Sequence, residues 1–231
     1  ADLRITAWQF AGLSSTFTLE LRGESLGEFQ LRVPGFHNIL NATAAVAVGL
    51  ELEVDLDLIR QGIMTFEGVD RRFQLKGVVN DITVVDDYAH HPTEIRATLD
   101  AIRGAQFRRI HVLFQPHRYS RTEQLLDEFA GAFNHASTVC VAPIYAASEK
   151  PIPGITSERL VERMREFGHR GAFSHDSLQS GADALLQVAE PGDAIVTMGA
   201  GNVSQFSDVL VERLEGGGRE AHANVQVAQG G

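Results

Sequence analysis

The sequence predicts an α/β fold, in which a Rossmann-like, mostly parallel sheet is flanked by helices and preceded by a β-hairpin and two helices. From residue 73 onward, short apolar runs alternate with helical stretches of ~10–15 residues, a pattern typical of βαβ units. Residues 1–70 lack this alternation and show a hairpin pattern followed by helical periodicity. The polar stretch EGVDRR at 67–72 separates the two patterns, so we expect one domain over 1–70 and another over 71–215.

The first domain is expected to contain one hairpin and two helices. Apolar residues alternate over 16–33 on both sides of GESLG, which predicts two paired strands. The alternating residues are Phe17, Leu19 and Leu21 before the turn, and Phe29, Leu31 and Val33 after it. Apolar residues at helical spacing predict helices over 37–50 and 56–66.

The second domain is expected to alternate strands with helices throughout. A turn at Asn80-Asp81 joins the first two predicted strands, which fits the preference of these residues for turns. The strands are predicted at 73–79, 82–86, 109–114, 137–142, 171–174 and 193–198. The helices are predicted at 92–103, 121–135, 156–167, 177–189 and 203–214.

Helix-terminal signals agree with these boundaries. Pro92 suits the first turn of a helix, and Glu94 follows it near the positive end of the helix dipole. Ser120 and Glu123 have the spacing of a capping box, which predicts a helix start there. The stretch 216–231 shows no periodicity, and we expect it to be a disordered tail.

Composition excludes several functional classes. The formal net charge of −10 argues against nonspecific binding to nucleic acid or to anionic lipid. The single cysteine, Cys140, excludes a disulfide framework and indicates a reducing compartment, the cytoplasm. No apolar run approaches the ~18 residues of a membrane span, and the first residues do not form a signal peptide. The chain does not start with methionine, so we expect it to be a fragment.

Three polar clusters follow predicted strands directly. They occupy 86–91 (DDYAHH), 114–121 (FQPHRYSR) and 199–202 (GAGN). In an open α/β sheet, ligands bind outside the carboxyl ends of the strands. The shared position of the clusters therefore predicts a ligand site at this edge of the sheet.

The first cluster allows three interpretations. A carboxylate such as that of Asp87 can accept hydrogen bonds from ribose hydroxyls, cap the helix that begins at Pro92, or bind a metal ion. His90 and His91 are adjacent and point in different directions on extended chain, so we do not expect both to bind one metal.

The other two clusters are also open to two interpretations each. The guanidinium groups of Arg118 and Arg121 match a carboxylate or phosphate, or they pair as exposed residues with neighbours such as Glu123. The Gly199–Asn202 turn could cradle a phosphate, but it lacks a third glycine, and such glycines more often only permit a tight turn.

Two asparagines open the helix predicted at 37–50. Asn38 and Asn41 lie three residues apart and therefore share one helix face. Two carboxamides can bind the donor and acceptor edge of a purine. Alternatively, Asn38 caps the helix and Asn41 has no special role.

Taken together, these stretches resemble the Mur ligase family. The matching stretches are VPGFHNILNATAA, FEGVDRRFQLKG, DDYAHHPTEI, FQPHRYSRT, PIPG and TMGAGN, which occur in family order over about residues 18–214. The resemblance implies an ATP-dependent ligase that joins an amino acid to a UDP-sugar acid through an amide bond in peptidoglycan precursor synthesis. The FQPHRYSR form favours the member that adds L-alanine to UDP-N-acetylmuramate over a close relative that recycles murein tripeptide.

The resemblance also implies the domain content. Family members have a UDP-sugar domain, a central ATP-binding domain and a Rossmann-like C-terminal domain. Residues 1–70 would then be the C-terminal part of an incomplete central domain. The chain contains no Gly-x-x-x-x-Gly-Lys-Ser/Thr loop for phosphate binding, so we expect it to be inactive alone. The main ligands of the Mg²⁺ cofactor would lie in the N-terminal part that is missing, and no metal ligand is assigned here.

By resemblance, individual residues receive expected roles. Asn38 and Asn41 match residues that contact adenine, and Arg72, Asp87 and His37 match positions near the nucleotide, with Asp87 on the ribose. Tyr88, His90, Arg118 and Arg121 match the positions around the incoming L-alanine, with the arginines on its carboxylate. Asp86, His91 and His117 are expected to support the loop.

Two alternatives remain from other functional classes. The chain could be a non-catalytic nucleotide-binding module, or a metal-dependent hydrolase that uses the Asp/His cluster. The expected partners are UDP-N-acetylmuramate and L-alanine, with no nucleic acid and no membrane insertion, and the sequence does not predict an oligomeric state.

Overall fold

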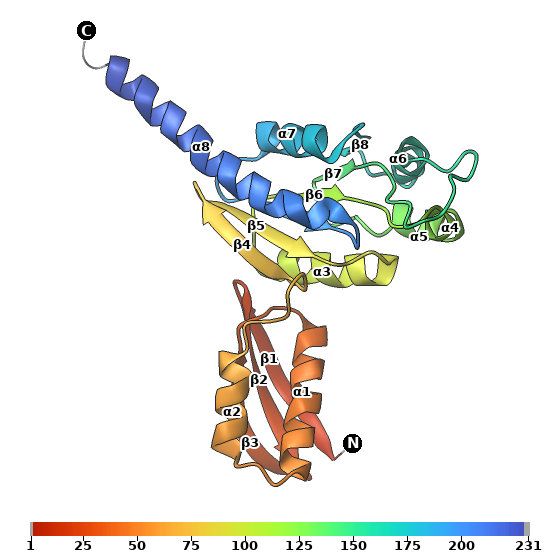
Figure 1. The fold of residues 1–231 in the computed structure, drawn as a ribbon. Helices are drawn as coiled ribbons and strands as arrows, with labels where there is room; N and C mark the ends of the chain where they lie inside the picture. The colour runs from red at the N-terminus through yellow and green to blue at the C-terminus, as the bar shows by residue number, and fades with distance from the viewer. Residues whose placement is uncertain (1, 229–231) are drawn as a thin grey trace. The chain divides into compact units, whose positions relative to one another are not determined.

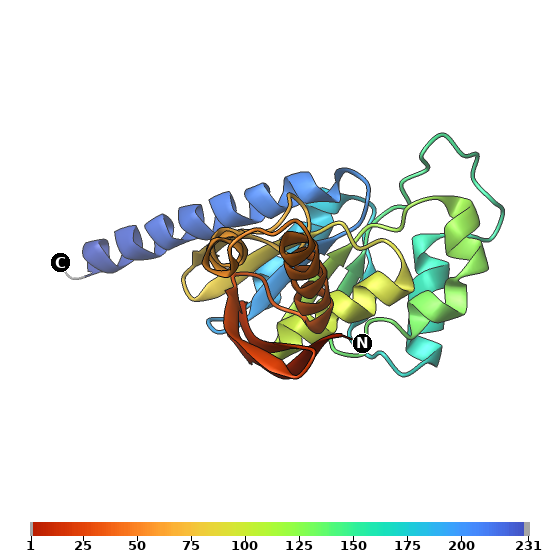
Figure 2. The ribbon, with the colours of Figure 1, turned by 90° about the horizontal axis from the view of Figure 1, so that it is seen from below.

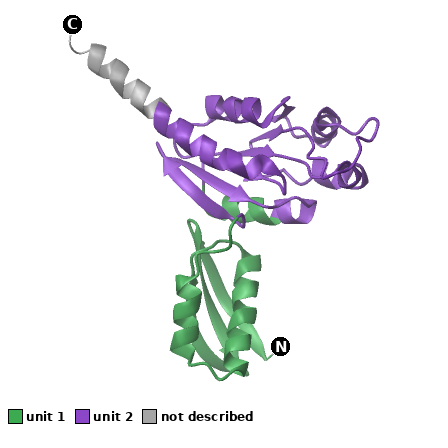
Figure 3. Cartoon of the chain, in the orientation of Figure 1, with its two compact units in different colours: residues 1–70, 97–106 green, residues 71–96, 107–231 purple. Residues whose placement is uncertain are grey.

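The computed structural model describes residues 2–228, and for residues 217–228 it describes the backbone alone. The chain divides into two compact units (Figure 3). The first comprises residues 1–70 and 97–106, and the second comprises residues 71–96 and 107 onward. The division after Asp70 falls within the polar stretch EGVDRR.

The first unit is a three-stranded antiparallel sheet with two helices on one face (Figures 1 and 2). Its elements are β1 (Leu3–Ala11), β2 (Ser14–Leu21), β3 (Glu24–Leu31), α1 (Phe36–Glu51) and α2 (Leu56–Thr65). The core between the layers is built from the apolar residues that predicted the hairpin, with Phe17 and Phe29 stacked at 5.5 Å between ring centroids. Burial of these alternating side chains holds the sheet against the helices.

The sequence did not predict β1, and it placed the hairpin turn differently. β1 pairs with β2, but its register shifts between Ile5 and Ala7, so the apolar alternation is interrupted. The turn between β2 and β3 is formed by Arg22 and Gly23, both with positive φ (52° and 95°). Such a two-residue turn suits the twist of a hairpin, and most of GESLG lies in β3.

The second unit contains a six-stranded sheet in the order β4-β5-β9-β6-β7-β8. β4 pairs antiparallel with β5 and all other pairs are parallel, which confirms the predicted α/β class with a mostly parallel sheet. The strands are β4 (Gln74–Val79), β5 (Ile82–Asp87), β6 (Ile110–Phe114), β7 (Thr138–Val141), β8 (Ala172–Ser174) and β9 (Ala194–Met198). Of the four inner strands, β5, β9 and β6 are buried along their whole length.

Helices cover this sheet on both faces (Figure 1). They are α3 (Pro92–Gly104), α4 (Tyr119–Gln124), α5 (Leu126–Ala130), α6 (Ser157–Glu166), α7 (Leu178–Val188), η1 (Asn202–Ser204) and α8 (Gln205–Ala228). α7 and α8 pack on the face that carries Val84, Leu113 and Ile195. On the other face, Phe114 of β6 contacts the rings of Phe129 and Phe133. Alternation along the buried strands therefore supplies apolar side chains to both layers.

Two predicted helix features were wrong in detail. The helix predicted at 121–135 is two short helices, because Leu125 leaves helical geometry (φ −114°, ψ 24°) and Gly131 ends α5. The capping box at Ser120 does not form. The backbone N–H and hydroxyl of Ser120 instead donate to Glu149 at 3.0 and 2.6 Å, and the N-cap residue of α4 is Arg118.

The last helix is longer than the sequence indicated. The expected end near residue 214 rested on the lack of periodicity from residue 216 onward. In the structure α8 continues to Ala228, and residues 229–231 of the expected disordered tail lie outside the described residues. Among the described residues, no helix combines the length and hydrophobicity needed to span a membrane.

Candidate functional site

The three polar clusters meet at the carboxyl ends of adjacent strands in the second unit. Because β9 lies between β5 and β6, the Gly199–Asn202 turn lies between the other two clusters. Backbone hydrogen bonds continue the sheet at this edge, from Gly199 N to Asp87 O at 3.1 Å and from Gln115 N to Met198 O at 2.9 Å. The strand order thus brings together segments that are more than 100 residues apart in sequence.

Asp86 and Asp87 end β5 with their carboxylates in different surroundings. Asp87 accepts from the backbone N–H groups of Phe73 (2.9 Å) and Ala89 (2.7 Å), and the residue is 5% exposed. Asp86 accepts from the Thr197 hydroxyl at 2.5 Å. Burial raises the pKa of Asp86 above its usual value, although Thr197 and Arg71 oppose this.

The hydrogen bonds from Phe73 and Ala89 to Asp87 come from residues outside α3, and a second carboxylate lies at the start of that helix. The Glu94 carboxylate accepts from the backbone N–H groups of His90 (3.1 Å) and His91 (3.2 Å), which precede α3. Burial alone would raise the pKa of Glu94, but the hydrogen bond from His90 N–H and the nearby His90 and Arg72 charges hold it below its usual value.

The two histidines of the first cluster have different surroundings. His90 is partly buried, with its Nδ1 3.0 Å from the Tyr88 carbonyl oxygen and its ring 6.0 Å from that of His117. His91 is exposed, and its Nδ1 accepts from Thr93 N–H at 3.3 Å. His90 therefore faces the second cluster, and His91 does not share its surroundings.

Positive charge concentrates at the second cluster. Arg118 is exposed and adopts left-handed backbone geometry (φ 76°), with its N–H donating to Tyr145 O at 2.8 Å. Arg121 is partly buried, and its Nη1 is enclosed without a hydrogen-bond partner. The same holds for Nδ1 of His117, whose ring stacks on that of Tyr145 at 5.4 Å. Burial and the charges of Arg121, His90 and Arg118 lower the pKa of His117, so this edge is poised for an anion.

Two arginines at the start of the second unit lie over the Tyr88 ring. The guanidinium carbons of Arg71 and Arg72 are 4.8 and 5.4 Å from the ring centroid. Arg72 is exposed and lies 3.5 Å from the Glu94 carboxylate. Arg71, which was not among the residues predicted from sequence, donates to the carbonyl oxygens of Gly199 and Gly201. No motif in the sequence distinguishes Arg71 from Arg72. The partners of Arg71 lie after β9, more than 100 residues further along the chain.

The Gly199–Asn202 turn is packed tightly against Gln115. The Gln115 amide nitrogen donates to Asn202 Oδ1 at 2.9 Å, and its oxygen accepts from Val203 N–H at 3.2 Å. Gly199 has a φ of 144°, and a Cβ at Gly201 would lie 2.9 Å from the Tyr145 ring. These contacts favour the tight-turn interpretation over a phosphate cradle, because the Val203 N–H is already bonded to Gln115.

The predicted residues of the first unit lie at the start of α1. Asn38 donates from Nδ2 to the Pro34 carbonyl at 2.7 Å, and the N-cap residue is Gly35, so the cap interpretation of Asn38 is wrong. His37 and Asn41 are exposed. Asn41 therefore presents its carboxamide on the same helix face as Asn38.

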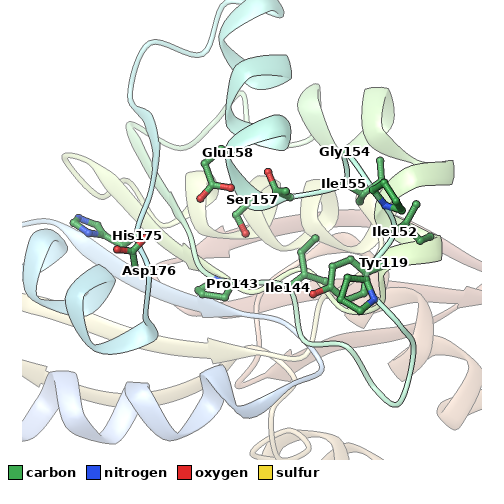
Figure 4. A pocket seen from close by; sticks show the side chains of 13 residues that line it. Tyr119, Pro143, Ile144, Ile152, Gly154, Ile155, Ser157, Glu158, His175 and Asp176 are labelled. Carbon is green, nitrogen blue, oxygen red and sulfur yellow. The ribbon is translucent and has the colours of Figure 1, made fainter.

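A pocket of about 520 Å³ lies beside this edge of the sheet, at the ends of β7 and β8 and the start of α6 (Figure 4). Its lining includes Tyr119, the PIPG stretch at 151–154, and the polar side chains of Glu158, His175 and Asp176. None of the site residues predicted from sequence lines it.

Metal binding has no geometric support in the part of the chain that the structure describes. There, no three His, Cys, Asp or Glu side chains group in a way that could hold a metal ion.

Comparison with known proteins gives consistent matches. The family model described as "Mur ligase, glutamate ligase domain" matches residues 71–201. UDP-N-acetylmuramate–L-alanine ligases of Solibacter usitatus and Koribacter versatilis are 58% and 55% identical to this chain, over 95% and 88% of it. The chain covers 46% and 43% of these proteins, so it spans about half the length of the curated relatives it matches.

Solved structures are similar as well. The crystal structure of UDP-N-acetylmuramate-alanine ligase from Thermotoga maritima matches with a TM-score of 0.78 and 28% identity, over 94% of this chain and 46% of the solved one. A murein peptide ligase from Psychrobacter arcticus matches with a TM-score of 0.59 and 26% identity, over 93% of this chain and 44% of its own.

Proposed function

The chain belongs to the Mur ligase family, and from that premise we propose that it forms part of an ATP-dependent ligase that adds L-alanine to UDP-N-acetylmuramate. The relatives that match over most of the chain carry that name. The reaction would supply a peptidoglycan precursor in the bacterial cytoplasm, where the substrates UDP-N-acetylmuramate, L-alanine and ATP are available.

One structural observation carries the proposal. Arg121 Nη1 and His117 Nδ1 are enclosed at the carboxyl edge of the sheet without hydrogen-bond partners. A buried donor without a partner costs free energy, so its presence favours a ligand that accepts from it. A carboxylate fits the Arg121 guanidinium, because two parallel N–H groups match its two oxygens. This supports binding of the amino-acid carboxylate by Arg121 together with Arg118.

The remaining assignments concern orientation of the amine and binding of the nucleotide. Tyr88 and His90 would orient the alanine. Their ring centroids are 5.1 Å apart, and the His90 ring lies 6.0 Å from that of His117 in the second cluster, which also contains Arg118 and Arg121. For the nucleotide, we propose Asn38 and Asn41 on adenine, Arg72 and His37 nearby, and Asp87 on the ribose. Asp87 would accept a hydrogen bond from a ribose hydroxyl through the same carboxylate that accepts from the Phe73 and Ala89 N–H groups.

The proposed chemistry forms one amide bond at the cost of one ATP. The lactyl carboxylate of the sugar substrate takes the terminal phosphoryl group, which gives an acyl phosphate and ADP. The alanine amine then attacks the acyl carbon, loses a proton and expels phosphate. Mg²⁺, if bound, would neutralise charge on the transferred group. The residues of this chain would hold the amine within about 3–3.5 Å of the acyl carbon by fixing the carboxylate end.

The test uses the full-length ligase with Arg118→Ala. Loss of one charged hydrogen-bonding partner costs about 1.5–3 kcal/mol, so the KM for L-alanine should rise about 10-fold to 150-fold. The KM for ATP should change by less than about 2-fold, because ATP does not use this partner. Steady-state ADP release, measured with each substrate varied in turn, gives both constants.

A matched control uses Arg159→Ala. This arginine lies on α6, outside the site, in an exposed ion pair with Glu162. Exposed pairs contribute little, so both constants should stay unchanged. Equal weakening of both substrates by Arg118→Ala would refute the assignment of Arg118 to the amino acid.

A second candidate is the ligase that recycles murein tripeptide, favoured by the structural match to the Psychrobacter arcticus murein peptide ligase. Supplying L-alanine or murein tripeptide as the only acceptor distinguishes the two enzymes. Faster ADP release with the tripeptide would replace the proposed alanine-adding activity.

A further inference from the structure

The guanidinium group of Arg71 links the carboxyl ends of β5 and β9 at the candidate site. Arg71 donates from Nη2 to Gly199 O at 2.7 Å and to Gly201 O at 3.2 Å. The same group lies over the Tyr88 ring, 4.8 Å from its centroid. A single side chain therefore contacts both the turn after β9 and the residue that follows β5.

A buried carboxylate forms an ion pair with this side chain. Arg71 Nε lies 3.6 Å from Asp86 Oδ2, and the Asp86 side chain is 2% exposed. The other oxygen of Asp86 accepts from Thr197 on β9. Attraction to a carboxylate that water cannot reach holds the guanidinium more firmly than a surface ion pair would.

The Arg71 backbone is tied to the same strand end. Its carbonyl accepts from Tyr88 N–H at 2.6 Å, and its N–H donates to the Gln74 side chain at 3.1 Å. Arg71 itself has left-handed geometry (φ 61°), which is uncommon for a residue with a long side chain. The surrounding contacts must compensate for this strain, and such positions concentrate at functional sites.

We infer that Arg71 is a positioning residue, which fixes the Tyr88 ring and the Gly199–Asn202 turn relative to each other for the ligation reaction. The inference rests on the proposed function, because Tyr88 is placed beside the amino acid there. The turn is held on one side by Arg71, through two carbonyl groups, and on the other by Gln115. Tyr88 can then keep one orientation while substrates bind.

Lysine cannot replace arginine in this role. A guanidinium is planar and carries several donors, so it can stack on a ring while it bonds two carbonyls. An ammonium group has no plane to stack on Tyr88 and would be pulled toward Asp86. Arg71→Lys therefore keeps the charge beside Asp86 and removes the link between Tyr88 and the turn.

The first experiment measures kinetics of the full-length ligase with Arg71→Lys, Tyr88→Ala and both changes together. Arg71→Lys should lower kcat/KM for L-alanine by at least about 5-fold, within the range of coupled contacts. If Arg71 acts through Tyr88, the double variant should be no slower than Tyr88→Ala alone, within about 2-fold. If the fold-loss of kcat/KM in the double variant equals the product of the losses in the two single variants, the inference is overturned.

The control is Arg163→Lys on α6. Its side chain is as exposed as that of Arg71 (30% against 29%), it is ion-paired, and it lies over the Phe167 ring. Its kinetics should match the wild type, since its partners Asp127, Glu166 and Phe167 are not site residues. An equal loss of activity in Arg163→Lys would show that the Arg71→Lys effect is general destabilisation, and would overturn the inference.

A second measurement does not depend on activity. Amide hydrogen exchange of the 231-residue chain should become faster over Gly199–Val203 in Arg71→Lys, and stay unchanged in β7. Unchanged exchange at the turn would overturn the inference whatever the kinetics show. An inactive wild-type ligase, with faster exchange at the turn in Arg71→Lys, would refute the proposed function and leave the clamp of Arg71 on the turn supported.

Discussion

Asp193 is a fully buried carboxylate just before β9, at the opposite edge of the sheet from the candidate site. It accepts from Arg109 Nε and Nη2 at 3.1 and 2.8 Å, and His111 Nε2 lies 3.1 Å from the same carboxylate. Burial alone would raise the pKa of Asp193, but these partners outweigh it and hold the pKa below its usual value. For His111, burial lowers the pKa below its usual value, although the hydrogen bond to Asp193 opposes this.

The first prediction at this scale is that Asp193→Asn destabilises the second unit by about 3 kcal/mol at pH 7, because it leaves a charged partner without its carboxylate. A folded-state pKa below the unfolded value gives stability that is present above the unfolded pKa and lost as the pH falls through the folded one. The difference between wild type and variant should therefore shrink below about pH 3.8. Chemical denaturation at several pH values measures it.

The control is Asp127→Asn, which removes an exposed carboxylate from its pair with Arg163. Because the pair is accessible to water, the change should cost much less than Asp193→Asn does. Equal effects of the two substitutions would contradict the structural role of the buried cluster.

The convergence of the polar clusters at the candidate site was predictable where local sequence carries the signal. Asp87, His90 and Arg121 lie in polar stretches that follow apolar runs, and parallel strands bring their carboxyl ends to one edge. Arg71 was not predictable, because its significance lies in carbonyl groups of Gly199 and Gly201. The partner of Ser120 was mistaken for the same reason, since Glu149 comes from a distant loop.

At the scale of elements, α7 lies unusually close to the sheet at one glycine. A Cβ on Gly181 would lie 2.8 Å from Cys140 Sγ and 2.9 Å from Leu113 Cδ1, which are buried side chains of β7 and β6. Close-packed interiors do not absorb an added methyl without shifts. Gly181 therefore permits the approach of the helix to the strands.

We predict that Gly181→Ala lowers the free energy of unfolding by about 1–3 kcal/mol through overpacking. Gly216→Ala is the matched control, because Gly216 lies in α8 and a Cβ there meets no atom within 4 Å. Alanine should stabilise that helix by about 0.5–1 kcal/mol, since glycine loses more backbone freedom on folding. Denaturation curves give the change in the free energy of unfolding for each variant, which should be negative for Gly181→Ala and positive for Gly216→Ala. Stabilisation by both substitutions would contradict the tight packing at Gly181.

Element boundaries were predictable wherever periodicity was regular. β5, β6 and β9 are continuous apolar runs, and α3 begins at Pro92 as its sequence indicates. β1 was missed because its bulge between Ile5 and Ala7 breaks the alternation on which strand prediction depends. α8 was predicted too short because residues 216–231 show no apolar periodicity, although the helix continues to Ala228.

For the whole molecule, the fold class was predictable because the βαβ alternation extends over most of the chain and constrains the strand order to few arrangements. The negative net charge argued against nucleic acid and anionic lipid as nonspecific partners, but it did not indicate which partner binds. The substrate was not derivable from such global properties. The proposed substrates entered through the resemblance of short motifs, three of which the fold brings to one edge of the second unit.

The last prediction concerns activity of the chain by itself. None of its 231 residues forms the Gly-x-x-x-x-Gly-Lys-Ser/Thr loop that cradles ATP phosphates, whereas the candidate amino-acid site is present. We therefore expect no alanine-dependent ADP release from this chain, and release from a version extended at its amino end. Phosphoryl transfer depends almost entirely on positioning and charge stabilisation, so residues that hold the amino acid cannot substitute for that loop. ADP release by the chain alone would show that these 231 residues bind the ATP phosphates themselves. ADP release by neither protein would contradict the ligase proposal.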